Sequence, residues 1–348
     1  MNIKDQATDS KGSDVEMTPD MFPSDLQGGT QTRTDKMFSI SPPPQPTPHI
    51  RALVARLDAF CQKHALLDPN LPILIALSGG ADSVFLLYYL QLRSCQLTAL
   101  HVNHMLRGSQ AERDARFCQM LCNAWNIPFV CVTCDVSARA KQTGESTETT
   151  ARMMRYEALG NFCDTQTAQG QMTPRIAAAH HADDQAETIL MHLLRGSDLR
   201  GSCGMRPTRR IFTPKGLQTT LIRPLLCLRK TEILYACRTL SLPYVTDETN
   251  NSTAYTRNRV RRALAPLCAN DFCGYPSALC RFRDAAARDE DYFTIQTEHF
   301  MRTHAQVFPG TCRVPRCAVA ELHPALATRI LRLSLIHISE PTRRTPIS

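Results

Sequence analysis

Six residues between positions 78 and 83 combine the backbone flexibility and the hydrogen-bond donors that a phosphate site needs. They are Ser78, Gly79, Gly80, Ala81, Asp82 and Ser83, and they directly follow the apolar run Ile73–Leu77. That run predicts a buried strand, and Val84–Leu90 beyond the loop predicts a helix. A strand, a glycine turn and a helix N-terminus form an anion-binding site, because unpaired N–H groups and the helix dipole face the turn. No lysine follows the glycines, so the loop is not a Walker A motif.

Two further groups of polar side chains suit nucleotide or phosphate binding. The segment His101–Gly108 places Asn103, His104 and Arg107 just beyond a predicted strand, where they can contact a nucleotide or order the loop. Arg152, Arg155 and Tyr156 have the i, i+3, i+4 spacing that puts them on one helical face. Two guanidinium groups on one face suit phosphate recognition, although a solvated salt-bridge face would show the same pattern.

Two carboxylates, Asp184 and Glu187, are three residues apart in the first turn of a predicted helix. Negative charge there complements the helix dipole. The functional alternative is a pair that binds Mg²⁺ or an amino group. His180 and His181 precede them, but a strand-to-helix junction does not offer the His-x-x-x-His face of a zinc helix.

A basic block near residue 260 is the fourth candidate. Four arginines, with an asparagine among them, fall within six positions, and a polyphosphate or an RNA backbone would be a natural counterpart. A solvated basic face is the alternative. The residues are Arg257, Asn258, Arg259, Arg261 and Arg262.

The elements that must position these groups alternate between strand and helix, which predicts an α/β fold with a doubly wound parallel sheet. Ligands of such sheets bind at the carboxyl ends of the strands, where Ser78, Asn103 and His180 fall. Ser109 and Glu112 predict a capping box. The predicted strands are 73–77, 97–103, 127–134 and 176–180, and the predicted helices are 53–64, 83–93, 109–126, 148–162 and 183–194.

Composition divides the chain into four parts. Residues 1–48 are polar, rich in proline and without periodicity, which predicts a disordered extension. Residues 49–268 form the predicted catalytic domain, and long helical stretches at 279–305 and 321–331 predict an incomplete helical domain over 269–332. Residues 333–348 resemble translated sequencing-adapter DNA, so we exclude them from the fold. A genuine C-terminal helix is the alternative.

Bulk composition favours a cytoplasmic protein. The 348 residues are 43% hydrophobic, carry a net charge of +8, and include 15 cysteines without the spacing of a disulfide scaffold. No apolar run reaches membrane-spanning length, and the N-terminus lacks a secretory pattern. Cys131 and Cys134 form C-x-x-C within a predicted strand, where positions three apart point to opposite faces. We therefore expect packed thiols there.

The motifs occur together in one order, and in this combination they resemble the tRNA(Ile)-lysidine synthetase family of PP-loop ATP pyrophosphatases. The resemblance is strong over about residues 50–268 and weak to 332, which implies a C-terminally truncated member. The motifs are S-G-G-A-D-S, H-V-N-H-x-L-R-G, E-x-x-x-R-x-x-R-Y, A-H-H-A-D-D-Q-A-E-T, R-G-S-D-L-R-G, R-P-L-L-x-x-R-K-x-E-I and D-E-T-N with Y-T-R-N-R-V-R.

The resemblance implies a PP-loop α/β fold (adenine nucleotide alpha hydrolase-like) and a ligase that uses ATP and Mg²⁺. It would join free lysine to the wobble cytidine of tRNA(Ile) with a CAU anticodon, through an adenylated intermediate. Asp82, Asp184 and Glu187 would be catalytic, with Asp82 and Asp184 near Mg²⁺. The implied nucleotide-binding residues are Ser78, Gly79, Gly80, Ala81, Asp82, Ser83, Asn103, His104 and Arg155, and the implied tRNA contacts are Arg152, Arg257, Asn258, Arg259 and Arg262.

Three alternatives stay open at this point. A PP-loop tRNA thiolase would need a set of cysteines that handles sulfur or a cluster. A PP-loop synthetase of amidotransferase type would act on a small molecule without RNA. A non-catalytic tRNA-binding protein would ignore ATP. No membrane partner is expected, and a homodimer is left open.

Overall fold

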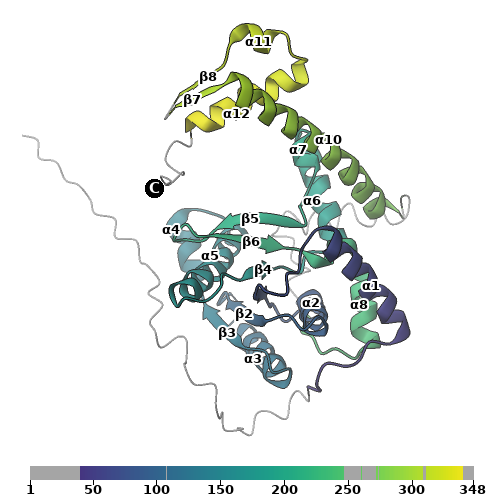
Figure 1. The fold of residues 1–348 in the computed structure, drawn as a ribbon. Helices are drawn as coiled ribbons and strands as arrows, with labels where there is room; N and C mark the ends of the chain where they lie inside the picture. The colour runs from purple at the N-terminus through teal and green to yellow at the C-terminus, as the bar shows by residue number, and fades with distance from the viewer. Residues whose placement is uncertain are drawn as a thin grey trace, which may run out of the picture.

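Six strands form one sheet in the order β3-β2-β1-β4-β6-β5 (Figure 1). The computed structural model describes residues 40–106, 108–246, 260, 272, 274–308 and 311–339. The first five strands in this order are parallel, and β5 pairs antiparallel with β6. The strands are β1 (Ile73–Ala76), β2 (Leu97–Asn103), β3 (Phe129–Thr133), β4 (Arg175–Ala177), β5 (Thr208–Phe212) and β6 (Gln218–Ile222).

Helices cover both faces of this sheet, which confirms the predicted α/β architecture (Figure 1). Ile73 and Ile75 belong to one buried cluster and Leu74 to the other, as the two-residue period of a strand requires. The helices of this domain are α1 (Pro48–Lys63), α2 (Ala81–Leu92), α3 (Ser109–Ala124), α4 (Val136–Thr143), α5 (Thr147–Ala168), α6 (Ala182–Leu194), α7 (Leu199–Ser202), the 3₁₀ helix η3 (Pro224–Cys227) and α8 (Lys230–Thr239).

The two faces are packed by different helices. Aromatic and aliphatic side chains of α2, including Phe85, Tyr88 and Tyr89, fill one face together with residues of α1, α3 and α8. Residues Leu159 and Phe162 of α5 fill the other. Because α2 is buried almost all round, the loop that precedes it is held between the sheet and the helices.

The predicted capping box at Ser109 is wrong. Helix α3 begins at Ser109 itself, and Gly108 precedes it with φ +49° and no side-chain cap. Glycine tolerates that left-handed conformation. A capping box occurs instead at the start of α6, between His181 and Asp184.

A second, smaller unit follows the sheet domain. The long helix α10 (Tyr275–His304) packs against α6 and α7 and continues to a small cluster around Phe300, Met301 and Ile330 (Figure 1). The other elements are β7 (Gln306–Phe308), β8 (Thr311–Arg313), α11 (Arg316–Ala320) and α12 (Pro324–Ser339).

The predicted ends of the chain are only partly within the described residues. Residues 1–39 and 340–348 lie outside them. Residues 40–47 lie against the domain, where the Ser41 carbonyl accepts a hydrogen bond of 3.0 Å from Trp125 Nε1. Helix α12 runs through Leu333, and the predicted adapter origin of residues 333–348 stays a prediction. Within the described ranges, no helix has the length and apolar character needed to cross a membrane.

Candidate active site

The loop between β1 and α2 is a tight turn that only glycine can make at its centre. Gly79 has φ +85°, and a Cβ there would lie 3.1 Å from Cys118 Sγ and 3.3 Å from Phe117 Cδ1. The loop is closed by hydroxyls, since Ser83 Oγ accepts from the Ser78 N–H at 3.2 Å and donates to the Gly80 carbonyl at 3.0 Å. Gly80 caps α2 without a side chain. The first N–H groups of α2 are therefore suited to an anion.

A pocket of about 430 Å³ opens beside this loop at the carboxyl edge of the sheet. That volume is in the range of small-molecule and cofactor sites. Its walls come from six segments far apart in the sequence: the loop, the end of β2, the start of α3, the start of α5, the end of β4 and the end of β6. The polar lining residues are Ser78, Asp82, Ser83, His101, Asn103, His104, Asp114, Arg152, Arg155, Tyr156 and His180.

The pocket brings together many of the residues predicted for nucleotide binding. The nucleotide-binding candidates that line it are Ser78, Asp82, Ser83, Asn103, His104 and Arg155. Arg152, which was predicted to contact tRNA, also lines it. Gly79, Gly80 and Ala81 belong to the same loop but do not line the pocket, and neither do Asp184 and Glu187. The predicted tRNA contacts Arg257, Asn258, Arg259 and Arg262 lie outside the described residues, as does Arg107.

Two guanidinium groups form the cationic side of the pocket. Arg155 Nη2 lies 3.4 Å from His104 Nε2, and the Arg152 guanidinium stacks 5.2 Å from the centre of the Tyr156 ring. The surrounding protein restricts solvation of the Arg155 guanidinium and thereby lowers its pKa; Tyr156 opposes this shift, and the charge of Arg152 adds to it. Within the described part of the chain, no carboxylate forms an ion pair with either arginine. This side of the pocket is therefore open to an anion.

His101 of β2 is hydrogen-bonded to the residue just before the loop. Its Nδ1 donates to the Leu77 carbonyl at 2.9 Å, because a carbonyl oxygen can only accept, and this fixes the tautomer. Burial lowers the pKa of His101, with the Leu77 hydrogen bond opposing the shift. The imidazole is thus a neutral structural brace.

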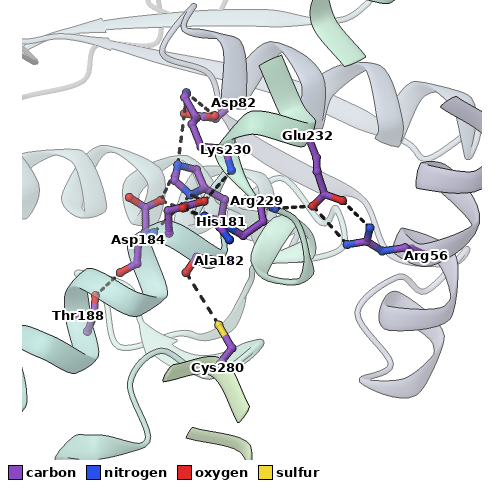
Figure 2. Close-up of polar contacts among 11 residues, drawn as sticks. Arg56, Asp82, His181, Ala182, Asp184, Thr188, Arg229, Lys230, Glu232 and Cys280 are labelled. Carbon is purple, nitrogen blue, oxygen red and sulfur yellow. Dashed lines mark hydrogen bonds and ion pairs between the residues drawn. The ribbon is translucent and has the colours of Figure 1, made fainter. Parts of the chain in front are cut away.

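Asp82 has a partner that the sequence analysis did not assign. Lys230 Nζ lies 2.6 and 2.7 Å from the two Asp82 oxygens (Figure 2). Lys230 is the first residue of α8, its side chain is 37% exposed, and the carboxylate that it contacts lines the pocket. The lysine was part of the R-P-L-L-x-x-R-K-x-E-I motif, which was the one signal that could have found it.

The two aspartates at the start of α6 hold helix ends together. Asp184 Oδ2 accepts from the His181 N–H at 3.1 Å, which completes the capping box (Figure 2). Asp183 accepts from Arg229 Nε at 3.0 Å and from the Lys230 N–H at 2.7 Å. Glu187 is buried one turn further along α6. The geometry therefore gives Asp184 a helix-capping role and leaves its predicted role in lysine recognition a proposal.

The two cysteines of the C-x-x-C pair differ in their exposure to solvent. Cys131 is exposed on β3, and Cys134 is buried one residue beyond the strand. The expectation of packing was thus wrong for Cys131. Among the residues that the structure describes, no group of three or more His, Cys, Asp or Glu side chains could hold a metal ion.

The sheet order, the glycine loop after the first strand and the pocket at the carboxyl edge define an ATP-binding α/β domain of the PP-loop class. Residues 51–268 match the protein family described as a PP-loop domain (ATP_bind_3), and the chain belongs to this family.

Curated relatives narrow the comparison within that class. The chain is 34% identical over 245 residues to a tRNA(Ile)-lysidine synthase of Bacillus subtilis, covering 70% of this chain and 50% of the relative. It is 35% identical over 262 residues to that of Geobacter sulfurreducens, covering 74% and 53%. It is 32% identical over 282 residues to the tRNA(Ile)-lysidine synthase of Clostridioides difficile, covering 79% of this chain and 58% of the relative. The chain thus spans about half the length of the curated relatives it matches.

A solved structure with a similar fold is the U34-tRNA thiolase NcsA from Methanococcus maripaludis with its [4Fe-4S] cluster. The TM-score is 0.51 at 17% identity, and the match covers 68% of this chain and 80% of that one. At this identity the likeness shows the fold alone.

Proposed function

We propose that this protein ligates lysine to C2 of the wobble cytidine of tRNA(Ile) with a CAU anticodon, consuming ATP and giving lysidine, AMP and diphosphate. The observation that carries the proposal is the pocket, where the PP-loop and two arginines without a described carboxylate partner face one cavity in a chain whose curated relatives are tRNA(Ile)-lysidine synthases. The thiolase alternative is supported only by a shared fold.

The loop would bind the β,γ-diphosphate of ATP. The glycine turn lets the backbone approach the phosphates, and the start of α2 supplies N–H donors and a favourable dipole. Lys230 already lies beside Asp82, so a rotation of its long side chain would bring the ammonium to the same phosphates. This charge-assisted contact would favour departure of the diphosphate as a unit.

Mg²⁺ fits the residues at this end of the pocket. The Ser78 and Ser83 hydroxyls are oxygen donors, the ligand type that Mg²⁺ prefers. The Asp82 carboxylate joins them once Lys230, which contacts both of its oxygens, has turned toward the phosphates. Asp184 is a weaker candidate, because it does not line the pocket and its Oδ2 accepts from the His181 N–H. When bound, the ion would supply charge neutralisation at the phosphates.

The chemistry requires two substitutions. The cytosine carbonyl oxygen attacks the α-phosphorus and diphosphate leaves, which attaches AMP at C2. The lysine ε-amine then forms the C2–N bond and AMP leaves, while the amine proton passes to a base. Asp184 and Glu187 are the proposed carboxylates for lysine recognition and for this proton, on the strength of the family resemblance. Arg152 and Arg155 would hold phosphate or RNA at the cationic side.

The test is incorporation of labelled lysine into a tRNA(Ile) transcript with a CAU anticodon. Label should enter the RNA only when ATP and Mg²⁺ are present, and the Asp82→Ala variant should incorporate none. A transcript with a GAU anticodon is the matched control and should stay unlabelled. Incorporation without ATP would refute the mechanism, and ATP–diphosphate exchange without RNA would favour a small-molecule synthetase instead.

A further inference from the structure

The β5–β6 hairpin carries positive charge without any acidic residue of its own. Between positions 206 and 223 the sequence contains four arginines and one lysine and no aspartate or glutamate. Arg206, Arg209 and Arg210 are exposed. No described carboxylate forms an ion pair with them. Exposed arginines without an ion-pair partner add charge repulsion to the folded state and do not stabilise it.

The register of the hairpin places one of these arginines beside the pocket. Arg209 pairs with Leu221 in the β5–β6 ladder, and Leu221 lines the pocket. Residues paired across two antiparallel strands have their side chains on the same face. Arg209 therefore lies on the pocket face of the sheet, whereas its neighbour Arg210 lies on the opposite face.

A buried arginine joins this strand to the cationic side of the pocket. Arg223 is 3% exposed, and its Nη1 donates to the Arg206 carbonyl at 2.7 Å. Burial lowers the pKa of Arg223, Tyr156 opposes this, and the charges of Arg209 and Arg152 lower it further. Arg152 lines the pocket together with Leu221, the ladder partner of Arg209, and the Arg206 carbonyl holds the buried Arg223, so we group Arg152, Arg206 and Arg209 as one cationic strip.

A carboxylate on the neighbouring helix α5 serves the far end of the hairpin. Asp164 is buried on α5, where it accepts hydrogen bonds from the Thr213 hydroxyl and from the Lys215 N–H at 3.1 Å. Both oxygens hold the hairpin turn, so this carboxylate anchors the turn and is not paired with Arg206 or Arg209.

We propose that three arginines bind the phosphate backbone of the RNA strand whose base enters the pocket. They are Arg209 of β5, Arg206 in the segment before β5, and Arg152 of α5. The inference rests on the proposed function, because that function makes RNA the polyanion that must reach the pocket. Guanidinium groups suit phosphodiesters through paired N–H donors. The charge on the pocket face would position the strand, and the sequence would be recognised elsewhere.

The test compares Arg209, together with Arg206 of the segment before β5, with Arg210 on the opposite face of the strand. The full chain is titrated with a transcript of the CAU anticodon stem–loop at several KCl concentrations, and ATP affinity is measured separately by calorimetry. In Arg206→Gln/Arg209→Gln the slope of log K against log salt should fall by about 1.4–1.8, because each phosphate that an arginine neutralises contributes roughly 0.7–0.9 to it. Arg210→Gln should keep the original slope, and ATP affinity should stay unchanged in both.

Two results would overturn the inference while the proposed function stands: unchanged RNA affinity and slope in the double variant, or an equal loss in Arg210→Gln. Loss of ATP affinity without loss of RNA affinity would assign the strip to ATP and would also overturn it. If the unsubstituted chain binds ATP but not the stem–loop, the RNA substrate of the proposed function fails as well. Thermal unfolding of each variant shows that the fold is intact.

Discussion

Replacing Gly79 by alanine tests the loop geometry most directly. The residue has φ +85°, a conformation that costs an L-residue about 1–2 kcal/mol. The added Cβ would also meet Cys118 Sγ at 3.1 Å and Phe117 at 3.3 Å, and overpacking of this kind costs about 1–3 kcal/mol. The expected loss of unfolding free energy is therefore about 2–5 kcal/mol, or roughly 4–20 °C in Tm.

Gly216 provides a matched control. It has φ +83°, and a Cβ there would meet nothing within 4 Å. Gly216→Ala should therefore cost only the backbone part, about 1–2 kcal/mol. Denaturant titrations followed by circular dichroism give both values, provided the m-value is unchanged. Equal losses in the two variants would refute the close approach of α3 to the loop.

A double variant isolates the steric part of the effect. Cys118→Ala removes the sulfur atom that the new Cβ would meet, so it should relieve part of the Gly79→Ala penalty. The coupling free energy should be favourable by about 0.5–3 kcal/mol, as for residues in contact. Strict additivity would mean that Cys118 does not crowd the turn.

Three further predictions address neighbouring groups. Lys230→Met should change the free energy of unfolding by less than about 1 kcal/mol, because the ion pair with Asp82 is partly exposed. It should weaken ATP binding roughly 10- to 150-fold, because a charged hydrogen bond worth about 1.5–3 kcal/mol is lost. Calorimetry measures the ATP affinity. Tyr88→Phe should leave stability unchanged or raise it by about 1 kcal/mol, because the buried Tyr88 hydroxyl has no hydrogen-bond partner among the described residues; denaturant titrations give the difference. Below about pH 6.5 the protein should lose stability, since the pKa of His101 is lowered from 6.5 by burial and only the unfolded state takes up the proton there; denaturant titrations should show a smaller slope with pH in His101→Gln.

Each of these has a result that would contradict it. Full ATP affinity in Lys230→Met would exclude a phosphate contact. Destabilisation by Tyr88→Phe would show that the hydroxyl has a partner. An identical pH slope in His101→Gln would mean that other groups, such as His64, whose pKa is also lowered by burial, account for the acid sensitivity.

Local patterns were sufficient for the parallel part of the sheet. Strand β2 has the predicted bounds, and α6 begins one residue earlier than predicted and ends where predicted, because an apolar run and a clear helical period define them. The β5–β6 hairpin was not predicted. Its strands, T-R-R-I-F and Q-T-T-L-I, are short and polar, and only pairing beside β4 makes them strands.

The candidate site shows the same limit. The rule that ligands bind at strand ends placed Ser78, Asn103 and His180 together, and all three line the pocket. Lys230 could not be found this way, because its contact with Asp82 joins residues 148 positions apart. For Asp184 the helix cap and a catalytic carboxylate have the same local pattern, so the sequence could not choose between them.

The 30-residue helix α10 limits the size of a ligand that could contact both of its ends. At 1.5 Å per residue it is about 45 Å long. Near its start Cys280 lies against Ala182 of α6, and near its end Phe300 and Met301 pack with Ile330 of α12. A continuous helix therefore holds the sheet domain and the small cluster around Phe300 at a fixed separation. A ligand the size of a nucleotide is too short to contact both ends of such a helix, whereas a folded macromolecule is long enough.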